Sequence, residues 1–206
     1  MIRRPRFFWR VRRMIEKSDI IIEVLDARFA EETRNRTLEQ FIAREGKKLI
    51  LVINKSDLVS RAYARSQMKK LQEVAPCVPF SVRKHWGTKK LRETIGKLSS
   101  GKEAKLSVIG YPNTGKSSLI NLLGGRRVAP VGQEPGVTRG QQYVRITNKV
   151  LMIDTPGVIP IAERSDFRLA LLGAKSPVQL SDAEGAAEGI INLLKLQNPE
   201  VLAERY

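Results

Sequence analysis

The sequence predicts an α/β fold with a mostly parallel β-sheet, one antiparallel edge strand and a small C-terminal helical extension. Short apolar runs rich in β-branched residues alternate with helical stretches, as in sheets joined by right-handed crossovers. The runs 19–26 and 48–54 are apolar almost throughout, which predicts strands buried on both faces. The runs 142–146 and 150–154 are too close for a crossover, so we expect a hairpin at the sheet edge.

The remaining elements follow in the same way. Further strands are predicted at 78–81 and 105–109, and helices at 11–17, 34–44, 61–74, 89–98 and 116–123. Residues 99–104 have no apolar periodicity and predict a flexible joint. From residue 165 onward the chain looks helical, and Ser181 with Glu184 fits a capping box. We therefore expect a basic N-terminal arm or helix over 1–18, a core domain over 19–164 and a helical extension over 165–206.

Length and composition limit the class of protein. The 206 residues suit one α/β core with an appendage. A single cysteine, Cys77, excludes a disulfide scaffold and a zinc ribbon. Every apolar run is too short to cross a bilayer, so we expect a cytoplasmic protein with no membrane role. We also expect a monomer.

The net charge of +16 and the pI near 10.3 indicate a polyanionic partner. Nucleic acid is favoured over a membrane surface because the N-terminal arginines surround a short aromatic cluster, 7–9, instead of lying opposite a continuous apolar face. The aromatic side chains can stack on exposed bases or pack on the domain itself, and both interpretations stand. The arginines are Arg3, Arg4, Arg6, Arg10, Arg12 and Arg13.

The stretch 110–117 fits the phosphate-binding pattern G-x-x-x-x-G-K-[ST] between a predicted strand and a predicted helix. Glycines let successive backbone N–H groups converge on phosphate oxygens at the helix N-terminus. Lys116 would reach the β- and γ-phosphates, and the Ser117 hydroxyl would bind Mg²⁺. The predicted contacts in this loop are Asn113, Thr114, Gly115, Lys116, Ser117 and Ser118.

Two later segments complete the phosphate end. Asp154 ends a predicted strand, where it can hold the water shell of Mg²⁺, and Gly157 would offer its N–H to the γ-phosphate. Thr138 is the best candidate for a second hydroxyl on Mg²⁺, although an ordinary surface loop is the alternative. Lys116, Thr138 and Gly157 are therefore the predicted catalytic residues.

The segment 54–57 reads Asn-Lys-Ser-Asp and follows a predicted strand. The Asp57 carboxylate can accept hydrogen bonds from the ring N–H and the amine of guanine, a pair that adenine does not offer. Asn54 would support the base and the Lys55 stem would cover it, with Ser56 between them. Ser81 and Val82 follow the next strand and could contribute backbone contacts to the same base.

In the Ras-like order of these motifs the phosphate loop comes first, whereas here the base motif precedes it. The chain thus resembles the circularly permuted P-loop GTPases of the YlqF/RbgA and YawG type over essentially its whole length, with the joint at 99–104 as the new connection. The matching stretches are 26–28, 54–57, 110–118, 135–138, 154–157 and 199–206.

The resemblance implies GTP hydrolysis to GDP, a role in assembly of the large ribosomal subunit, and ribosomal RNA or the subunit precursor as partner. It also implies stimulation by K⁺, with Asn113 helping to coordinate that ion. Val158 stands where many GTPases carry a catalytic glutamine, and the one histidine, His85, is poorly placed for phosphate chemistry. The chain also ends where bacterial members continue into a helical RNA-binding domain. The alternatives are an RNA-binding assembly protein with structural, non-cycling GTP and a GTPase of tRNA modification or transport.

Overall fold

The computed structural model describes residues 6–124, 143–147, 150–153 and 165–197. By its contacts the chain divides into two compact units, residues 1–158 and 159–206, which are described separately. The first unit contains the sheet and both predicted nucleotide motifs.

The first unit is built on a six-stranded sheet in which every neighbouring pair but one is parallel. The last strand, β5, runs antiparallel to β6 at one edge. The predicted mostly parallel α/β sheet is confirmed. The strand order is β3-β2-β1-β4-β6-β5, with β1 Ile20–Asp26, β2 Lys48–Asn54, β3 Cys77–Pro79, β4 Ala104–Gly110, β5 Tyr143–Thr147 and β6 Val150–Ile153.

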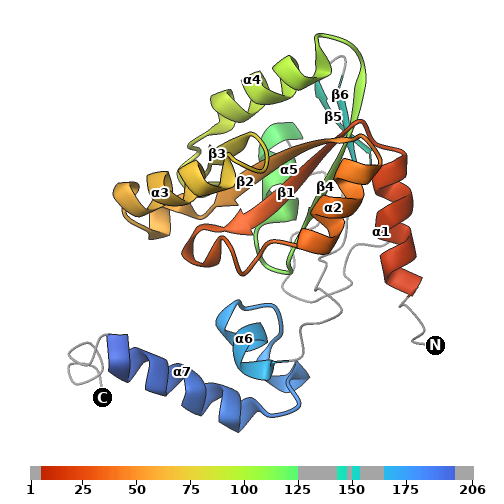
Figure 1. Cartoon of the computed structure of the whole chain (residues 1–206). Helices are drawn as coiled ribbons and strands as arrows, with labels where there is room; N and C mark the ends of the chain where they lie inside the picture. Colours follow the sequence, from red (N-terminus) through yellow and green to blue (C-terminus); the bar gives the residue numbers. More distant parts are fainter. Residues whose placement is uncertain (1–5, 125–142, 148–149, 154–164, 198–206) are drawn as a thin grey trace. The chain divides into compact units, whose positions relative to one another are not determined.

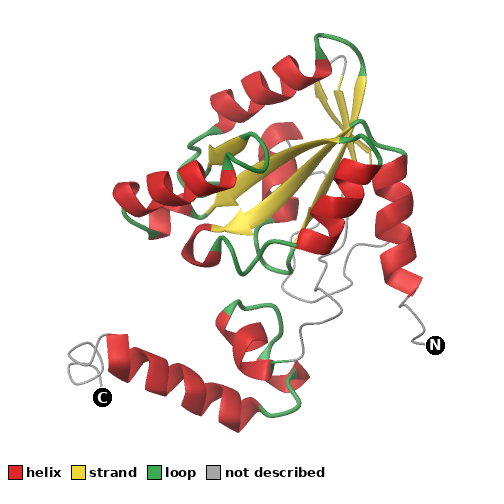
Figure 2. Ribbon diagram, in the orientation of Figure 1, coloured by secondary structure: helices red, strands yellow, loops and turns green. Residues whose placement is uncertain are grey.

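Helices cover both faces of this sheet (Figures 1 and 2). Along β1, Ile20, Ile22 and Val24 pack with the helices of one face, whereas Ile21 packs with those of the other. This alternation follows from the two-residue period of a strand, and it explains why β1 is buried along its whole length. The first face carries α4 (Thr88–Ser99) and α5 (Lys116–Gly124); the second carries α1 (Arg6–Glu16), α2 (Arg36–Arg44) and α3 (Arg61–Leu71).

The strand register brings the predicted motifs to one edge of the sheet. Asp26 at the end of β1 lies beside Asn54 at the end of β2, and Val24 lies beside Gly110 at the end of β4. Because parallel strands present their carboxyl ends at the same edge, the base motif after β2 and the phosphate loop after β4 become near neighbours. The ends of β2, β1 and β4 are thus neighbours at one edge of the sheet, although the base motif precedes the phosphate loop in the chain.

The connection from α4 to β4, where the sequence predicts a flexible joint, is short. Helix α4 ends at Ser99 and β4 begins at Ala104, with Ser100 and Gly101 in the left-handed region between them. At the start of β4, the Lys105 N–H donates to the Asp19 carboxylate over 2.8 Å. The joint predicted at 99–104 is therefore a tight turn tied to the start of β1.

The second unit contains α6 (Asp166–Leu171) and α7 (Ala183–Gln197), so helices follow residue 165 as predicted. The predicted capping box is wrong, because α7 begins after Asp182, whose carboxylate accepts the Gly185 N–H over 2.8 Å. The Asp166 carboxylate accepts hydrogen bonds from the Ser181 and Asp182 N–H groups, and these bonds connect the start of α7 to α6. In the part of the chain that the structure describes, no helix is long and apolar enough to span a bilayer.

Candidate nucleotide-binding site

The phosphate loop has a backbone that only glycine permits at its first position. Gly110 has a φ of 145°, and a Cβ there would lie 2.4 Å from the carbonyl oxygen of Val24 on the neighbouring strand. Asn113 and Gly115 also have positive φ values, 60° and 98°. The chain therefore curls sharply between β4 and α5, which turns successive N–H groups toward one centre.

Lys116 is held inside this loop on the first turn of α5. Its side chain is buried, with 7% of its surface exposed, and Nζ donates to the carbonyl oxygen of Tyr111 over 2.6 Å. The Leu119 N–H donates to the carbonyl of Gly115, so the helix begins at the end of the loop. Ser117 and Ser118 follow as half-buried hydroxyls at the positive end of the helix. This cradle fits a bound phosphate group, and the Ser117 hydroxyl is an oxygen ligand of the kind that Mg²⁺ prefers beside phosphates.

Asn54 joins the base motif to the phosphate loop. Its Nδ2 donates to the carbonyl oxygen of Thr114 over 2.7 Å, and its Oδ1 accepts the Val82 N–H over 3.2 Å. A Cβ at Gly115 would lie 2.2 Å from Asn54 Nδ2, so this approach requires glycine. Segments 60 residues apart in the chain thus form one site.

The carboxylate predicted to read the base, that of Asp57, is held by a residue that follows β3. Ser81 Oγ donates to Asp57 Oδ1 over 2.5 Å. The neighbouring residue Ser56 is fixed as well: its N–H donates to the carbonyl of Phe80, and its hydroxyl donates to the carbonyl of Ile53. The predicted base contacts, 54–57 and Ser81 with Val82, therefore lie together at the ends of β2 and β3.

Asp26 belongs to this site, although sequence reasoning did not place it there. Lys55 has a left-handed backbone with a φ of 61°, and its Nζ donates to Asp26 Oδ2 over 2.7 Å. Arg28 donates to both oxygens of the same carboxylate, over 2.9 and 2.7 Å. Burial would raise the pKa of Asp26, but the hydrogen bonds from Arg28 and Lys55 outweigh it and lower that pKa. Asp26 thus holds the Lys55 stem in place; the segment 26–28 that carries it was a signal in the sequence.

Comparison with known proteins identifies the domain. Residues 105–201 match the family model described as 50S ribosome-binding GTPase. The matched segment, which begins with the phosphate loop's strand, is thus similar to a GTPase domain of this kind. The GTPase family predicted from the motifs is therefore confirmed.

Several relatives resemble the chain beyond the phosphate loop. An uncharacterized GTP-binding protein of Methanocaldococcus jannaschii is 44% identical over 162 residues, which cover 76% of this chain and 42% of that protein. Nucleolar GTP-binding protein 2 is 34% identical in Pneumocystis carinii, covering 90% and 40%, and 36% identical in Saccharomyces cerevisiae, covering 91% and 40%. The chain thus spans about two fifths of the length of these relatives.

A solved structure supports the fold. The crystal structure of YjeQ from Thermotoga maritima aligns with a TM-score of 0.50 and 20% identity, covering 85% of this chain and 70% of that one. At this identity the likeness concerns the fold alone.

Three predicted residues of the GTPase domain lie outside the described residues: Thr138, Asp154 and Gly157. Their roles at Mg²⁺ and the γ-phosphate stay predictions, as does a K⁺ ion at Asn113, which is exposed on the loop. Among the residues that the structure does describe, no cluster of histidine, cysteine, aspartate or glutamate forms a metal site.

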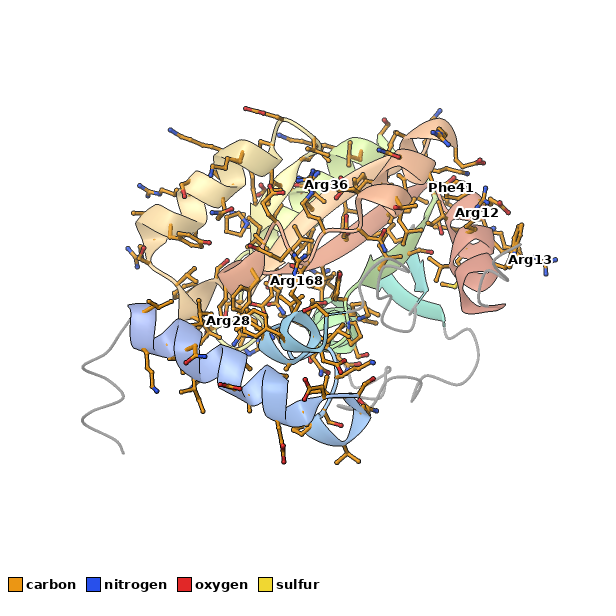
Figure 3. The ribbon with its side chains drawn as sticks, turned by 60° about the horizontal axis from the view of Figure 1, so that its bottom comes forward. Arg12, Arg13, Arg28, Arg36, Phe41 and Arg168 are labelled. Atoms are coloured by element: carbon orange, nitrogen blue, oxygen red, sulfur yellow. The ribbon has the colours of Figure 1, made fainter. Side chains whose placement is uncertain are left out.

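The predicted N-terminal arm includes α1, one side of which packs into the core of the GTPase domain. Val11 and Ile15 are buried with Ile42 of α2. The Arg12 guanidinium lies 4.1 Å from the ring centre of Phe41 and 5.5 Å from that of Trp9, while Arg13 is exposed (Figure 3). Trp9 keeps 58% of its surface exposed. Arg13 and much of the Trp9 ring therefore remain accessible on this helix, whereas Arg12 is half-buried against Phe41.

Proposed function

We propose that this domain binds and hydrolyses GTP, and that the protein acts in assembly of the large ribosomal subunit while bound to ribosomal RNA. The observation that carries the nucleotide part is the double hydrogen bond of Asn54, to Thr114 in the phosphate loop and to Val82 after β3. It holds residues 54–57 next to the phosphate loop, which supports the proposal that one purine nucleotide binds across both. The buried Lys116 ammonium supplies positive charge at the phosphate end.

The base preference rests on Asp57, because its carboxylate can accept two hydrogen bonds from guanine. Asp57→Asn should weaken GTP binding roughly 10- to 100-fold, the cost of losing charge-assisted hydrogen bonds. It should also favour xanthosine triphosphate, whose carbonyl replaces the guanine amine. Competition titrations with GTP, XTP and ATP measure this. A variant with unchanged preference, or a wild type that binds ATP as well as GTP, would remove Asp57 from this role.

Hydrolysis would proceed by in-line attack of water on the γ-phosphate, with developing charge neutralised by Lys116. Mg²⁺, held by Ser117 with Thr138 and Asp154, and K⁺ at Asn113 would supply further positive charge when bound. His85, the one histidine of the chain, lies on an exposed turn after β3, and Val158 offers no proton acceptor. We therefore expect slow intrinsic turnover that K⁺ and a ribosomal particle accelerate.

Lys116→Ala separates a hydrolytic cycle from GTP held as a structural ligand. In a cycling GTPase, release from pre-ribosomal particles depends on the nucleotide, so this variant should lose the difference between its GTP- and GDP-dependent binding to them. Co-sedimentation of wild type and variant with particles measures this. Equal particle binding by the wild type in GTP and GDP would instead indicate a passive assembly protein.

The RNA and ribosome part of the proposal is supported by charge and by the relatives. The net charge of +16 favours a polyanion, and the exposed Arg13 and Trp9 on α1 offer a phosphate and a stacking contact. The matching family is described as ribosome-binding, and several relatives are named nucleolar GTP-binding proteins. A cytoplasmic location and a monomeric state remain predictions.

A further inference from the structure

A closed turn between β3 and α4 presents a tryptophan among four cations. The backbone N–H of Trp86 donates to the carbonyl of Ser81 over 3.1 Å, and the backbone N–H of Ser81 donates to the carbonyl of Trp86 over 3.3 Å. Trp86 keeps 47% of its surface exposed. The segment 82–90 contains no acidic residue, and its basic residues, all exposed, are Arg83, Lys84, Lys89 and Lys90.

The turn is rigidly built. Gly87 has a φ of 81°, and a Cβ there would lie 2.5 Å from the carbonyl oxygen of Pro79 and 2.8 Å from Phe80 Cδ2. Phe80 and Leu91 on either side are fully buried in the core. Trp86 is therefore held at the surface by a fixed backbone, which lowers the entropy cost of binding a ligand against its ring.

The chemistry of this surface fits unpaired RNA. An exposed indole offers a stacking face that accepts any base, and neighbouring cations neutralise the phosphates of a single strand. A membrane surface would require a continuous apolar face opposite the charges. Residues 82–90 read Val-Arg-Lys-His-Trp-Gly-Thr-Lys-Lys, and Trp86 is the one large apolar side chain among them. An A-form duplex keeps its bases stacked inside, so it would not use the indole.

The same turn is tied to the base-reading residues. Ser81 Oγ donates to Asp57 and accepts the Lys84 N–H over 3.0 Å, and the Val82 N–H donates to Asn54. A ligand on the turn would therefore contact a segment that also orients the predicted guanine site.

We infer that residues 82–90 form a binding site for unpaired RNA, in which a base stacks on Trp86 and the four basic side chains contact phosphates. This inference rests on the proposed function, since it assigns a place to the RNA partner. It is distinct from the arginines of α1, which lie in another part of the chain.

Fluorescence can observe this site directly, because the chain has two tryptophans, Trp9 and Trp86. In Trp9→Phe, emission comes from Trp86 alone, and a single-stranded oligouridylate of about 12 nucleotides, a length typical of such sites, should quench it. Trp86→Ala should lower affinity for the same oligonucleotide at least fivefold, and Trp86→Phe should restore part of it. Tyr63→Ala is the matched control, since Tyr63 is 41% exposed between Arg61 and Arg65 and should change affinity less than twofold.

Salt dependence tests the phosphate contacts. Lys89→Gln with Lys90→Gln should reduce the slope of log affinity against log salt by about 1.4, since each single-strand phosphate contact contributes about 0.7. The control pair Lys69→Gln with Lys70→Gln, two adjacent exposed lysines near the end of α3, should leave the slope unchanged.

The outcomes separate this inference from the proposed function. Wild-type protein that binds no RNA would overturn this inference together with the RNA-binding part of the proposed function, and would leave the GTPase part standing. Normal RNA binding by Trp86→Ala, or an equal loss in Tyr63→Ala, would overturn only the site at 82–90. A parallel loss of GDP affinity in Trp86→Ala would place the ring at the guanine, and binding of phosphatidylserine vesicles without RNA binding would indicate a membrane; either result also overturns the site.

Discussion

Two buried carboxyl groups on β1, three residues apart, lie in opposite electrostatic environments. At the end of the strand, Asp26 accepts hydrogen bonds from Arg28 and Lys55, and its pKa is lowered. In the middle of the strand, Glu23 accepts one N–H, from Asn35, and its Oε2 is buried without a hydrogen-bond partner. Burial, and then the neighbouring Glu39, raise the pKa of Glu23 to about 8.

The nearest cation explains the difference. The charge of Arg34 lowers the pKa of Glu23 only weakly, because its guanidinium donates to both oxygens of Glu39, over 2.8 and 2.6 Å, and to Glu31. Glu23 therefore faces burial without a cation of its own, whereas Asp26 has two. Neither side chain is exposed, but Glu23 is enclosed more deeply than Asp26, so burial and the partners together decide which carboxyl group is charged at neutral pH.

The largest expected effect concerns Glu23. Its pKa is higher in the folded than in the unfolded state, so folding is favoured at low pH and stability falls as pH rises from about 4.5 to about 8. The limiting slope is about 1.4 kcal/mol per pH unit. Glu23→Gln stays neutral and keeps an acceptor for the Asn35 N–H. Between pH 5.5 and pH 8.5, the wild type should therefore lose up to about 3 kcal/mol more free energy of unfolding than this variant. Urea unfolding at both pH values measures this; parallel wild-type and variant profiles would contradict it.

A smaller effect is expected at Asp26. Asp26→Asn removes the charge that Arg28 and Lys55 share, and should destabilise the fold by about 1–2 kcal/mol, because both cations can still reach solvent. Lys55 loses its anchor, so GDP affinity should fall roughly tenfold. The lowered pKa means that wild type loses this stabilisation as pH falls through the folded pKa of Asp26, and the variant should lack that acid dependence. GDP titrations and urea unfolding at acidic and neutral pH test both points. Unchanged GDP affinity would show that Asp26 does not position Lys55.

The smallest effect is expected at Arg28, whose side chain is 40% exposed. Arg28→Lys keeps the charge but loses the two parallel hydrogen bonds to Asp26, and solvent screens the pair, so the cost should be about 0.5 kcal/mol. Thermal unfolding compared with Asp26→Asn measures it. A loss as large as that of Asp26→Asn would show that Arg28, and not Lys55, is the main partner of Asp26.

Much of the fold, the phosphate loop and the base motif were predictable because they depend on local patterns. The β-branched runs predicted β1, β2 and β4, since a strand buried on both faces cannot alternate with polar residues. The glycines of 110–115 and the string 54–57 were recognisable because a phosphate loop and a guanine-reading turn require particular residue types at fixed spacing. The cap of α7 was misassigned because Ser181 and Asp182 are both good capping residues, and only the contacts of Asp166 decide between them.

Most of the secondary structure, the phosphate loop and the base motif follow from the amino-acid sequence alone, because each is set by side chains a few residues apart. The tertiary structure decided that Asn54 touches Thr114, that Asp26 holds Lys55, and that Glu23 lacks the cation which Asp26 has. These contacts depend on the order and register of the parallel strands, which place residues 29 and 60 positions apart within hydrogen-bond distance. No local pattern contains that register.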